Sequence, residues 1–323
     1  MKKLLGSFVL GMLVLSSCKK AAIADAEALD QDVTTVSQRS CTSVDHLQNQ
    51  LAEDPSLQSK MDAIEDLTRK VERGLVPMRL LADGSIEIPV VFNVLYRTTA
   101  ENVSLAQLQS QIDVLNEDYA GTNADYSASN PYNAVKAGDI KVRFVLDQVV
   151  RRQTSKTSWS TNDAMKKSAS GIAPTSPTTK LNIWVCNMGG GILGYAQFPG
   201  GSSSTDGVVL DNNATGRTGT AAAPFNLGRT ATHEVGHWLN LRHIWGDATC
   251  GNDQVGDTPL HNTANYGCPA AGHRSTCTGT PLEMTMNYMD YTDDACMYMF
   301  SAGQKTRMLA TFNVGGGRTT FAQ

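Results

Sequence analysis

One string of eleven residues constrains the fold of this chain more than any other feature: His233-Glu234-Val235-Gly236-His237-Trp238-Leu239-Asn240-Leu241-Arg242-His243. Residues four apart on a helix share a face, so His233 and His237 can direct their imidazoles at one ion. A straight helix would carry His243 onto another face and too far along the axis. His243 therefore reaches the same ion only if the helix ends near Leu239 and the chain turns back.

The turn needs a residue that tolerates the left-handed backbone conformation, which is usually Gly. Asn240 stands there, and Asn is one of the few other residues that take this conformation. We predict a helix over residues 227–239, a turn at Asn240, and three imidazoles around one zinc ion. Zinc binds imidazole nitrogens at about 2.0–2.1 Å, and three protein ligands leave its fourth position open for chemistry.

Glu234 follows the first of these histidines, so its carboxylate can act as general base on an attacking water without taking a coordination position. A helix with surface histidines and a structural metal site are the alternatives. The third histidine at this spacing, with a suitable turn residue, favours a catalytic zinc ion bound by His233, His237 and His243.

A second string supports the same interpretation. Asn287-Tyr288-Met289-Asp290-Tyr291 resembles the tight turn that places a methionine beneath the zinc ligands of metzincins. Met289 would form an apolar floor without binding the metal, and Tyr291 would donate a hydrogen bond to the tetrahedral intermediate. An ordinary buried Met and Tyr would be the better explanation if this string stood alone.

The first residues are typical of an export signal. Two lysines precede an apolar run over residues 4–15, which is too short to span a bilayer as a helix. The run ends in Leu15-Ser16-Ser17-Cys18, which resembles a bacterial lipobox. We predict a lipoprotein signal peptide over residues 1–17 and a lipid on Cys18 that anchors the protein to a membrane outside the cytoplasm. An ordinary signal peptide with an incidental cysteine is the alternative.

Residues 19–38 are poor in large apolar side chains, as expected of a tether. Apolar residues then recur at helical spacing over residues 44–73, with one break at Pro55. This stretch is too small for a domain, so we predict a tether and pro-segment over residues 18–80 and a catalytic domain over residues 81–323. Its basic residues offer processing sites: Arg69, Lys70, Arg73 and Arg79.

The next part of the chain alternates strands with helices around one sheet. Residues rich in Val, Ile and aromatics predict strands over 86–96, 140–150, 181–187, 192–198 and 208–210. Ser104 is a good N-cap for a helix that ends near Gly121 and buries Leu105, Leu108, Ile112 and Leu115. Ser301 and Gln304 predict a capping box at a final helix.

The chain has seven cysteines, and four of them fall between residues 250 and 296, where regular patterning almost vanishes. Outside the cytoplasm, so many cysteines in an irregular stretch predict two disulfides. Four cysteines allow three pairings, and the residues themselves do not choose among them.

The strings HEVGHWLNLRHIWGD and NYMDYTDDACMYMF together resemble the pappalysin family of metzincins, and the resemblance extends from about residue 86 to the C-terminus. It implies an α+β, metzincin-type zincin domain: a mixed, mostly parallel twisted sheet with active-site and backing helices. An N-terminal subdomain over residues 81–243 would precede an irregular, disulfide-rich C-terminal subdomain over residues 244–323. The implied activity is endopeptidase cleavage of proteins or peptides, before a basic residue in the small members.

The resemblance also implies roles for residues near the substrate. Asp294 would line the pocket for the basic side chain, because a carboxylate selects Arg or Lys by charge and hydrogen bonding. The alternative is that Asp293 and Asp294 are two solvated acids in a loop. The strand predicted over residues 192–198 resembles the upper-rim strand that pairs with the substrate backbone.

Two structural features of the C-terminal part follow from the resemblance as well. The implied disulfides are Cys250–Cys277 and Cys268–Cys296. The implied calcium site takes oxygen atoms from the loop after the zinc helix, at Asp253, Asp257 and Thr258. Asp and Thr are also ordinary turn residues, which is the alternative.

Arg39-Ser40-Cys41-Thr42 resembles the cysteine switch with which metzincin pro-segments fill the open metal position. We predict that Cys41 keeps the protein latent, with a Cys41–Cys186 disulfide or a plain free thiol as alternatives. The chain departs from the family at Asn240, where Gly is usual, and in its lipid anchor, which is not general in the family.

A net charge of −4 gives no nucleic-acid footprint. A surface lipoprotein that binds host or matrix protein without activity is the rival class, but such a protein has little reason to retain Glu234. We therefore predict a secreted, lipid-anchored zinc endopeptidase, made as a zymogen, that cuts proteins before Arg or Lys. A protease restricted to one prohormone-like substrate or to itself is the second hypothesis, and the oligomeric state stays open.

Overall fold

The computed structural model describes residues 36–79 and 84–322. All of them belong to one compact unit, Val36–Gln323. The predicted signal peptide over residues 1–17 and the anchor at Cys18 lie outside the described residues. None of the helices in the two described stretches has the length and apolarity needed to cross a bilayer.

Five strands form one sheet in the order β2-β1-β3-β5-β4. They are β1 (Ile86–Tyr96), β2 (Val142–Gln153), β3 (Leu181–Cys186), β4 (Gly194–Ala196) and β5 (Val208–Asp211). The first four in the sheet are parallel, and the edge strand β4 runs antiparallel to β5. The predicted mixed, mostly parallel sheet is confirmed, and each strand lies within a few residues of its predicted position.

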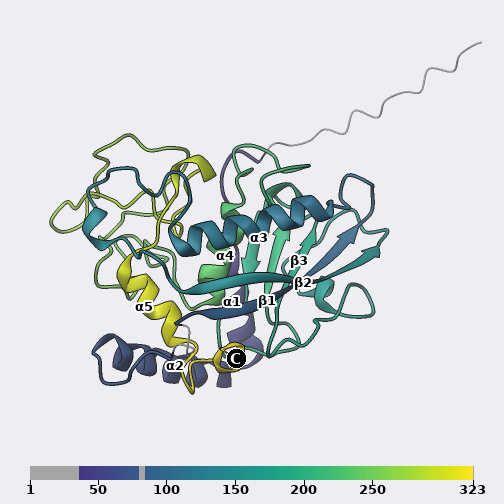
Figure 1. Cartoon of the computed structure of the whole chain (residues 1–323), viewed down its shortest axis with the longest axis horizontal. Coiled ribbons are helices and arrows are strands. Elements are labelled where there is room, and N and C mark those ends of the chain that lie inside the picture. The colour runs from purple at the N-terminus through teal and green to yellow at the C-terminus, as the bar shows by residue number, and fades with distance from the viewer. Residues whose placement is uncertain (1–35, 80–83, 323) are drawn as a thin grey trace, which may run out of the picture. The chain divides into compact units, whose positions relative to one another are not determined.

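Two helices, α3 (Leu105–Ala120) and α4 (Arg229–Trp238), pack together and contact the sheet, and Figure 1 shows α3 crossing its strands. Ser104 caps α3 by accepting a hydrogen bond from the backbone N of Gln107, and Gly121 ends it with φ of 64°. Leu105 is 58% exposed, so the prediction that it is buried is wrong. Burial on α3 begins at Gln107, because the helix starts outside the layer that covers its later turns.

Residues 244–300 contain little regular structure besides the short 3-10 turn Asp294–Cys296. Two disulfides tie this stretch together, Cys250–Cys277 and Cys268–Cys296, which is the pairing implied by the family resemblance. The last helix, α5 (Ala302–Ala310), begins with the predicted capping box of Ser301 and Gln304.

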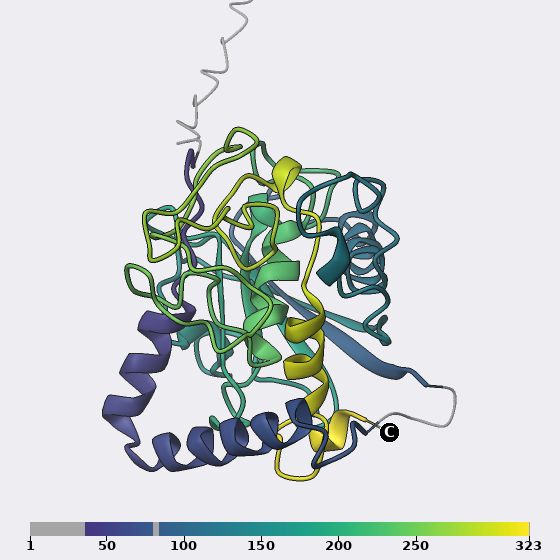
Figure 2. The same cartoon turned by 90° about the vertical axis from the view of Figure 1, so that its left-hand side faces the viewer.

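The N-terminal segment, which we define as residues 36–79, forms two helices on either side of Pro55, as the apolar spacing predicts. The helix α1 (Ser43–Glu53) contacts β4, and α2 (Ser56–Glu72) contacts α5. Figure 2 shows α2 lying beneath α5. The segment therefore extends from the edge of the sheet to the C-terminal helix.

Candidate active site

The helix α4 ends in the predicted turn. Asn240 has φ of 72°, in the left-handed region. The backbone N of Asn240 donates to His237 O, and that of Leu241 donates to Gly236 O, each at 2.9 Å. This is the hydrogen-bond pattern of a Schellman turn. The chain therefore reverses directly after the helix and brings His243 back beside it.

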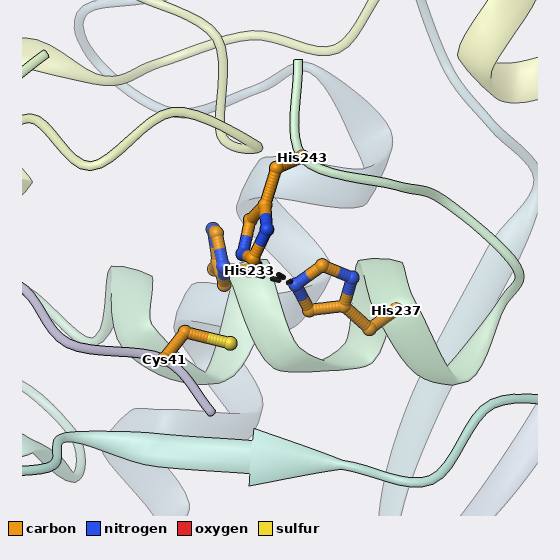
Figure 3. A group of neighbouring side chains, drawn as sticks. All are labelled: Cys41, His233, His237 and His243. Atoms are coloured by element: carbon orange, nitrogen blue, oxygen red, sulfur yellow. Dashed lines mark hydrogen bonds between the residues drawn. The ribbon is translucent and has the colours of Figure 1, made fainter. Parts of the chain in front are cut away.

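The structure brings the three predicted ligand side chains to one point (Figure 3). His237 Nε2 lies 3.2 Å from His233 Nε2 and 3.1 Å from His243 Nε2. All three residues are buried, with exposed fractions between 0% and 2%. Three ring nitrogens thus face a common centre inside the protein.

The hydrogen bonds at the Nδ1 atoms determine which nitrogen of each ring carries the proton. His233 Nδ1 lies 2.7 Å from Tyr288 O, and His237 Nδ1 lies 2.8 Å from Leu241 O. A carbonyl oxygen only accepts hydrogen bonds, so both Nδ1 atoms donate, and both Nε2 atoms carry a lone pair.

His243 has the same arrangement, because its Nδ1 lies 2.5 Å from Asp247 Oδ1. Burial and the neighbouring imidazoles hold the pKa of His237 at about 3 and the pKa of His233 well below its usual value. The three Nε2 atoms lie close enough together to be directed at one cation. Three imidazoles, each oriented by a hydrogen bond at its other nitrogen, fit a zinc ion.

Met289 lies directly beneath α4. A Cβ atom on Gly236 would lie 2.5 Å from Met289 Sδ, so this close approach requires a glycine in the helix. Met289 is fully buried, and its carbonyl oxygen accepts a hydrogen bond from the backbone N of Ile244. The role of Gly236 was not predicted, although a glycine inside a helix is a signal for close packing.

Glu234 is buried beside the three imidazoles. Its Oε2 accepts hydrogen bonds from Ser43 Oγ at 2.9 Å and from Cys41 Sγ at 3.3 Å. Its Oε1 has no hydrogen-bond partner among the described residues. Burial raises the pKa of Glu234 to about 7. The carboxyl group therefore has one oxygen without a protein donor, and its other oxygen contacts the thiol that lies among the imidazoles.

Residues 40–43 of the N-terminal segment lie along the edge strand β4. The backbone N of Leu193 donates to Ser40 O at 2.9 Å, and that of Thr42 donates to Gly194 O at 3.3 Å. The pairing between Cys41 and Gly194 is parallel. An extended chain thus occupies the edge of the sheet in front of the imidazoles.

Within this stretch, Cys41 is the side chain that joins the histidine cluster (Figure 3). Its Sγ and one ring nitrogen of each histidine all lie within 4.8 Å of one another. Tyr291 Oη donates to Cys41 O at 2.8 Å. Burial raises the pKa of the Cys41 thiol, so a thiolate there needs a nearby cation. Cys41 and Cys186 are both free, and the structure contains no disulfide between these two described residues.

Asp294 is fully buried and holds Arg39 of the N-terminal segment. Arg39 Nη2 lies 2.6 Å from Asp294 Oδ1, and its guanidinium carbon lies 5.0 Å from the centre of the Phe225 ring. Asp294 Oδ2 accepts hydrogen bonds from the backbone N of Leu227 at 2.8 Å and of Arg229 at 3.2 Å. Asp294 is therefore a buried acid paired with an arginine, and the alternative of a solvated acid is wrong for it.

The loop after the zinc helix uses the residues expected to bind calcium in hydrogen bonds. Asp253 accepts a hydrogen bond from Thr258 Oγ1 at 2.9 Å. Asp257 accepts hydrogen bonds from Ser301 Oγ and the backbone N of Gly303 at the start of α5. Asp257 thus stabilises the first turn of a helix, and calcium binding by these residues stays a prediction.

Three side chains of the site were not predicted. Arg39 and Ser43 flank Cys41, and Asp247 follows His243 by four residues. The partners of Arg39 and Ser43 are 255 and 191 residues away in the chain, so no local pattern indicates them. Asp247 could have been found, because ligating histidines commonly donate their other N–H to a nearby carboxylate.

The fold and this centre define the class of the protein, which is that of the metalloproteases. Residues 177–313 match the model of the peptidase M43 family, described as pregnancy-associated plasma protein-A. The chain is 36% identical to extracellular metalloprotease 1 of Coccidioides posadasii over 239 residues. This match spans 69% of the present chain and 75% of the relative. The chain belongs to the peptidase M43, or pappalysin, family.

Two solved structures are similar in fold and sequence. Mature mirolysin of Tannerella forsythia in complex with a cleaved peptide has a TM-score of 0.71 and 43% identity, over 74% of this chain and 96% of that one. A mutant of Tannerella forsythia promirolysin has a TM-score of 0.77 and 39% identity, over 88% of this chain and 97% of that one. The metzincin-type fold expected from the sequence is thereby confirmed.

The left-handed turn determines how substitutions at Asn240 behave. We expect Asn240→Gly to leave the free energy of unfolding nearly unchanged, because glycine adopts this conformation without steric strain. Asn240→Ala should lower it by about 1 kcal/mol and weaken metal binding, because the Ala Cβ disfavours positive φ. Denaturant unfolding and metal titration of both variants check this. Equal behaviour of the two variants would show that the turn does not depend on residue 240.

Proposed function

We propose that the protein is an extracellular zinc metalloendopeptidase, made as a latent zymogen, that cuts proteins on the N-terminal side of Arg or Lys. One observation carries the proposal: three imidazole nitrogens converge in a buried space near Glu234, and the N-terminal segment places a cysteine among them and an arginine on Asp294. The relatives named extracellular metalloprotease and the promirolysin structure support an exported enzyme with a zymogen form.

His233, His237 and His243 would hold the zinc ion. A zinc ion so bound supplies Lewis acidity and makes water acidic enough to be deprotonated near neutral pH. Glu234 accepts the proton of the attacking water and passes it to the leaving amine, which its raised pKa suits. Tyr291 Oη, which donates to Cys41 O in the zymogen, becomes free to donate to the oxyanion of the substrate.

Residues 36–79 act in this proposal as the described part of the pro-segment. Cys41 fills the position that the attacking water needs, and Ser43 occupies Glu234 Oε2 through a hydrogen bond of 2.9 Å. Tyr291 is engaged by the backbone of the same stretch. One short piece of the chain therefore contacts Glu234, Tyr291 and the histidine cluster.

Arg39 supports the assignment of the specificity pocket. It places a guanidinium on Asp294 as a basic substrate side chain would. In a substrate, that side chain would follow the scissile carbonyl, whereas Arg39 precedes Cys41, which lies at the metal centre. The pro-segment would therefore run through the cleft in the opposite direction to a substrate, and it presents no peptide bond in the productive order.

The lipid anchor and the calcium site complete the proposal. A lipid on Cys18 would keep the precursor at a membrane outside the cytoplasm, and loss of the cleaved pro-segment would release the enzyme. Calcium bound at Asp253, Asp257 and Thr258 would stiffen the loop that follows the zinc helix.

Removal of the metal ion should abolish activity, and so should removal of the Glu234 carboxylate while the metal ion stays bound. We expect phenanthroline to stop casein digestion by the processed enzyme and added zinc to restore it. Glu234→Gln should lower kcat by about a thousandfold, because it removes the general base, and it should leave the zinc content at one ion per chain. Digestion that continues in the presence of the chelator, or a fully active Glu234→Gln enzyme, would contradict the proposal.

Replacement of the switch cysteine should shorten latency. We expect the full-length Cys41→Ser chain to process itself at least about tenfold faster than the unaltered chain, because serine is a poor zinc ligand at neutral pH. Cys186→Ser is the matched control, since Cys186 is also a free buried thiol. Gel electrophoresis at successive times measures the rate of self-processing. Equal rates in Cys41→Ser and Cys186→Ser would exclude a switch at Cys41.

The pocket acid predicts a charge-dependent specificity. Asp294→Asn keeps an oxygen for the two backbone N–H donors but removes the negative charge. We expect kcat/KM for peptides with Arg after the scissile bond to fall by about tenfold to a hundredfold, because a charged hydrogen bond is lost. Peptides with Leu there should change little. Asp293→Asn is the neighbouring control, and an unchanged preference for Arg in Asp294→Asn would overturn the assignment.

A further inference from the structure

The N-terminal segment also contacts the rest of the protein through α2, which follows α1 and packs against α5. Arg307 of α5 has a side chain that is only 1% exposed. Its Nη2 lies 2.8 Å from Glu65 Oε2, and its Nη1 lies 3.0 Å from Glu65 Oε1. Glu72 Oε1 lies 3.5 Å from the same Nη1. A two-pronged bond between a guanidinium and a carboxylate is among the strongest and most directional in proteins.

Both of these carboxylates belong to α2 and neither belongs to the catalytic part of the chain. Among the described residues 84–322, Arg307 donates to Gln254 O at 3.1 Å, and no carboxylate there forms an ion pair with it. Departure of the N-terminal segment would break the two-pronged bond between Arg307 and Glu65. This bond is charged and directional, so Arg307 favours retention of the segment.

Apolar contacts surround this ion pair. Leu57, Ile64 and Val71 of α2 are buried, with exposed fractions between 4% and 6%. Ile64 lies against two glycines of the catalytic part: a Cβ on Gly200 would approach Ile64 Cδ1 to 3.4 Å, and one on Gly317 to 3.2 Å. The surface under α2 is therefore shaped for this helix.

The contact continues to the end of the described segment. Asn313 accepts a hydrogen bond from the backbone N of Arg79 and donates to Pro77 O, each at 2.8 Å. The Arg79 guanidinium donates to Thr319 O and Ala322 O, each at 3.0 Å. None of these contacts involves the groups assigned to catalysis.

We propose that α5 and the chain after it form a second docking surface for the pro-segment, centred on Arg307 and Glu65, that retains the pro-segment after the chain is cut between residues 79 and 84. The inference rests on the proposed zymogen. Its partner is the amphipathic helix α2 that carries Glu65 and Glu72. A single cut after the pro-segment therefore leaves the enzyme latent, and activity requires a further cut within the pro-segment.

The test uses the full chain with Glu234→Gln, so that it does not process itself, and with a specific protease site placed between Arg79 and Gly84. After cutting, size-exclusion chromatography at increasing salt measures how fast the pro-segment leaves. We expect the cut pro-segment to co-elute with the catalytic part. Glu65→Gln should accelerate its release by at least about tenfold, because the charged bond to Arg307 is lost. Asp66→Asn, which alters an adjacent carboxylate that is 53% exposed, should change the rate less than about twofold.

Arg307→Met completes the comparison. In that background, Glu65→Gln should add no further acceleration if the two side chains act as a pair. If Arg307→Met does not fold, Glu65→Gln still decides, because it leaves the catalytic part unaltered. Release from the cut, otherwise unaltered chain as fast as from Glu65→Gln would overturn the docking surface.

The outcome is separable from that of the cysteine switch. A pro-segment that leaves at once after the cut, in a chain whose uncut form depends on Cys41 for latency, would reject the docking surface alone. A pro-segment that stays bound, in a chain whose latency ignores Cys41→Ser, would reject the switch alone.

Discussion

The structure depends on the convergence of three imidazole nitrogens in a buried space. His237 Nε2 lies 3.2 Å from His233 Nε2 and 3.1 Å from His243 Nε2, so the three nitrogens surround a position that suits a cation. Hydrogen bonds at the three Nδ1 atoms fix the orientation of the rings. The acceptors are Tyr288 O, Leu241 O and Asp247 Oδ1. Two residues of the zinc-binding string serve this convergence. The left-handed turn at Asn240 brings His243 back beside the helix, and the absence of a side chain at Gly236 leaves room for Met289 beneath it.

The edge of the sheet gives this centre its second property. The strand β4 offers backbone groups to an extended chain, and residues 40–43 use them in the structure. The N-terminal segment is then bound at three places with different chemistry: a guanidinium on Asp294, a thiol among the imidazoles, and a carboxylate pair on Arg307. In the proposed zymogen, several contacts along one segment would together maintain latency, and each contact would be lost separately during maturation.

Residue type and spacing predicted the structural features that depend on neighbouring residues in the chain. The bounds of β1, the N-cap at Ser104 and the capping box at Ser301 follow from residue type and spacing, and the structure contains all three. The error at Leu105 has a tertiary cause, because helical spacing defines a face and does not define where the covering layer begins. Arg39 and Arg307 could not be predicted, because their partners lie 255 and 242 residues away. The two disulfide pairs needed the family resemblance, since spacing alone leaves three pairings open.

The central claim is that one zinc ion is bound by the three imidazoles and, in the zymogen, by Cys41. Zinc K-edge X-ray absorption of the full-length chain tests it most directly. The account predicts three nitrogen ligands at about 2.0–2.1 Å and one sulfur at about 2.3 Å, with the sulfur absent after maturation. A zymogen spectrum with no sulfur, or with fewer than three imidazoles, would contradict the account.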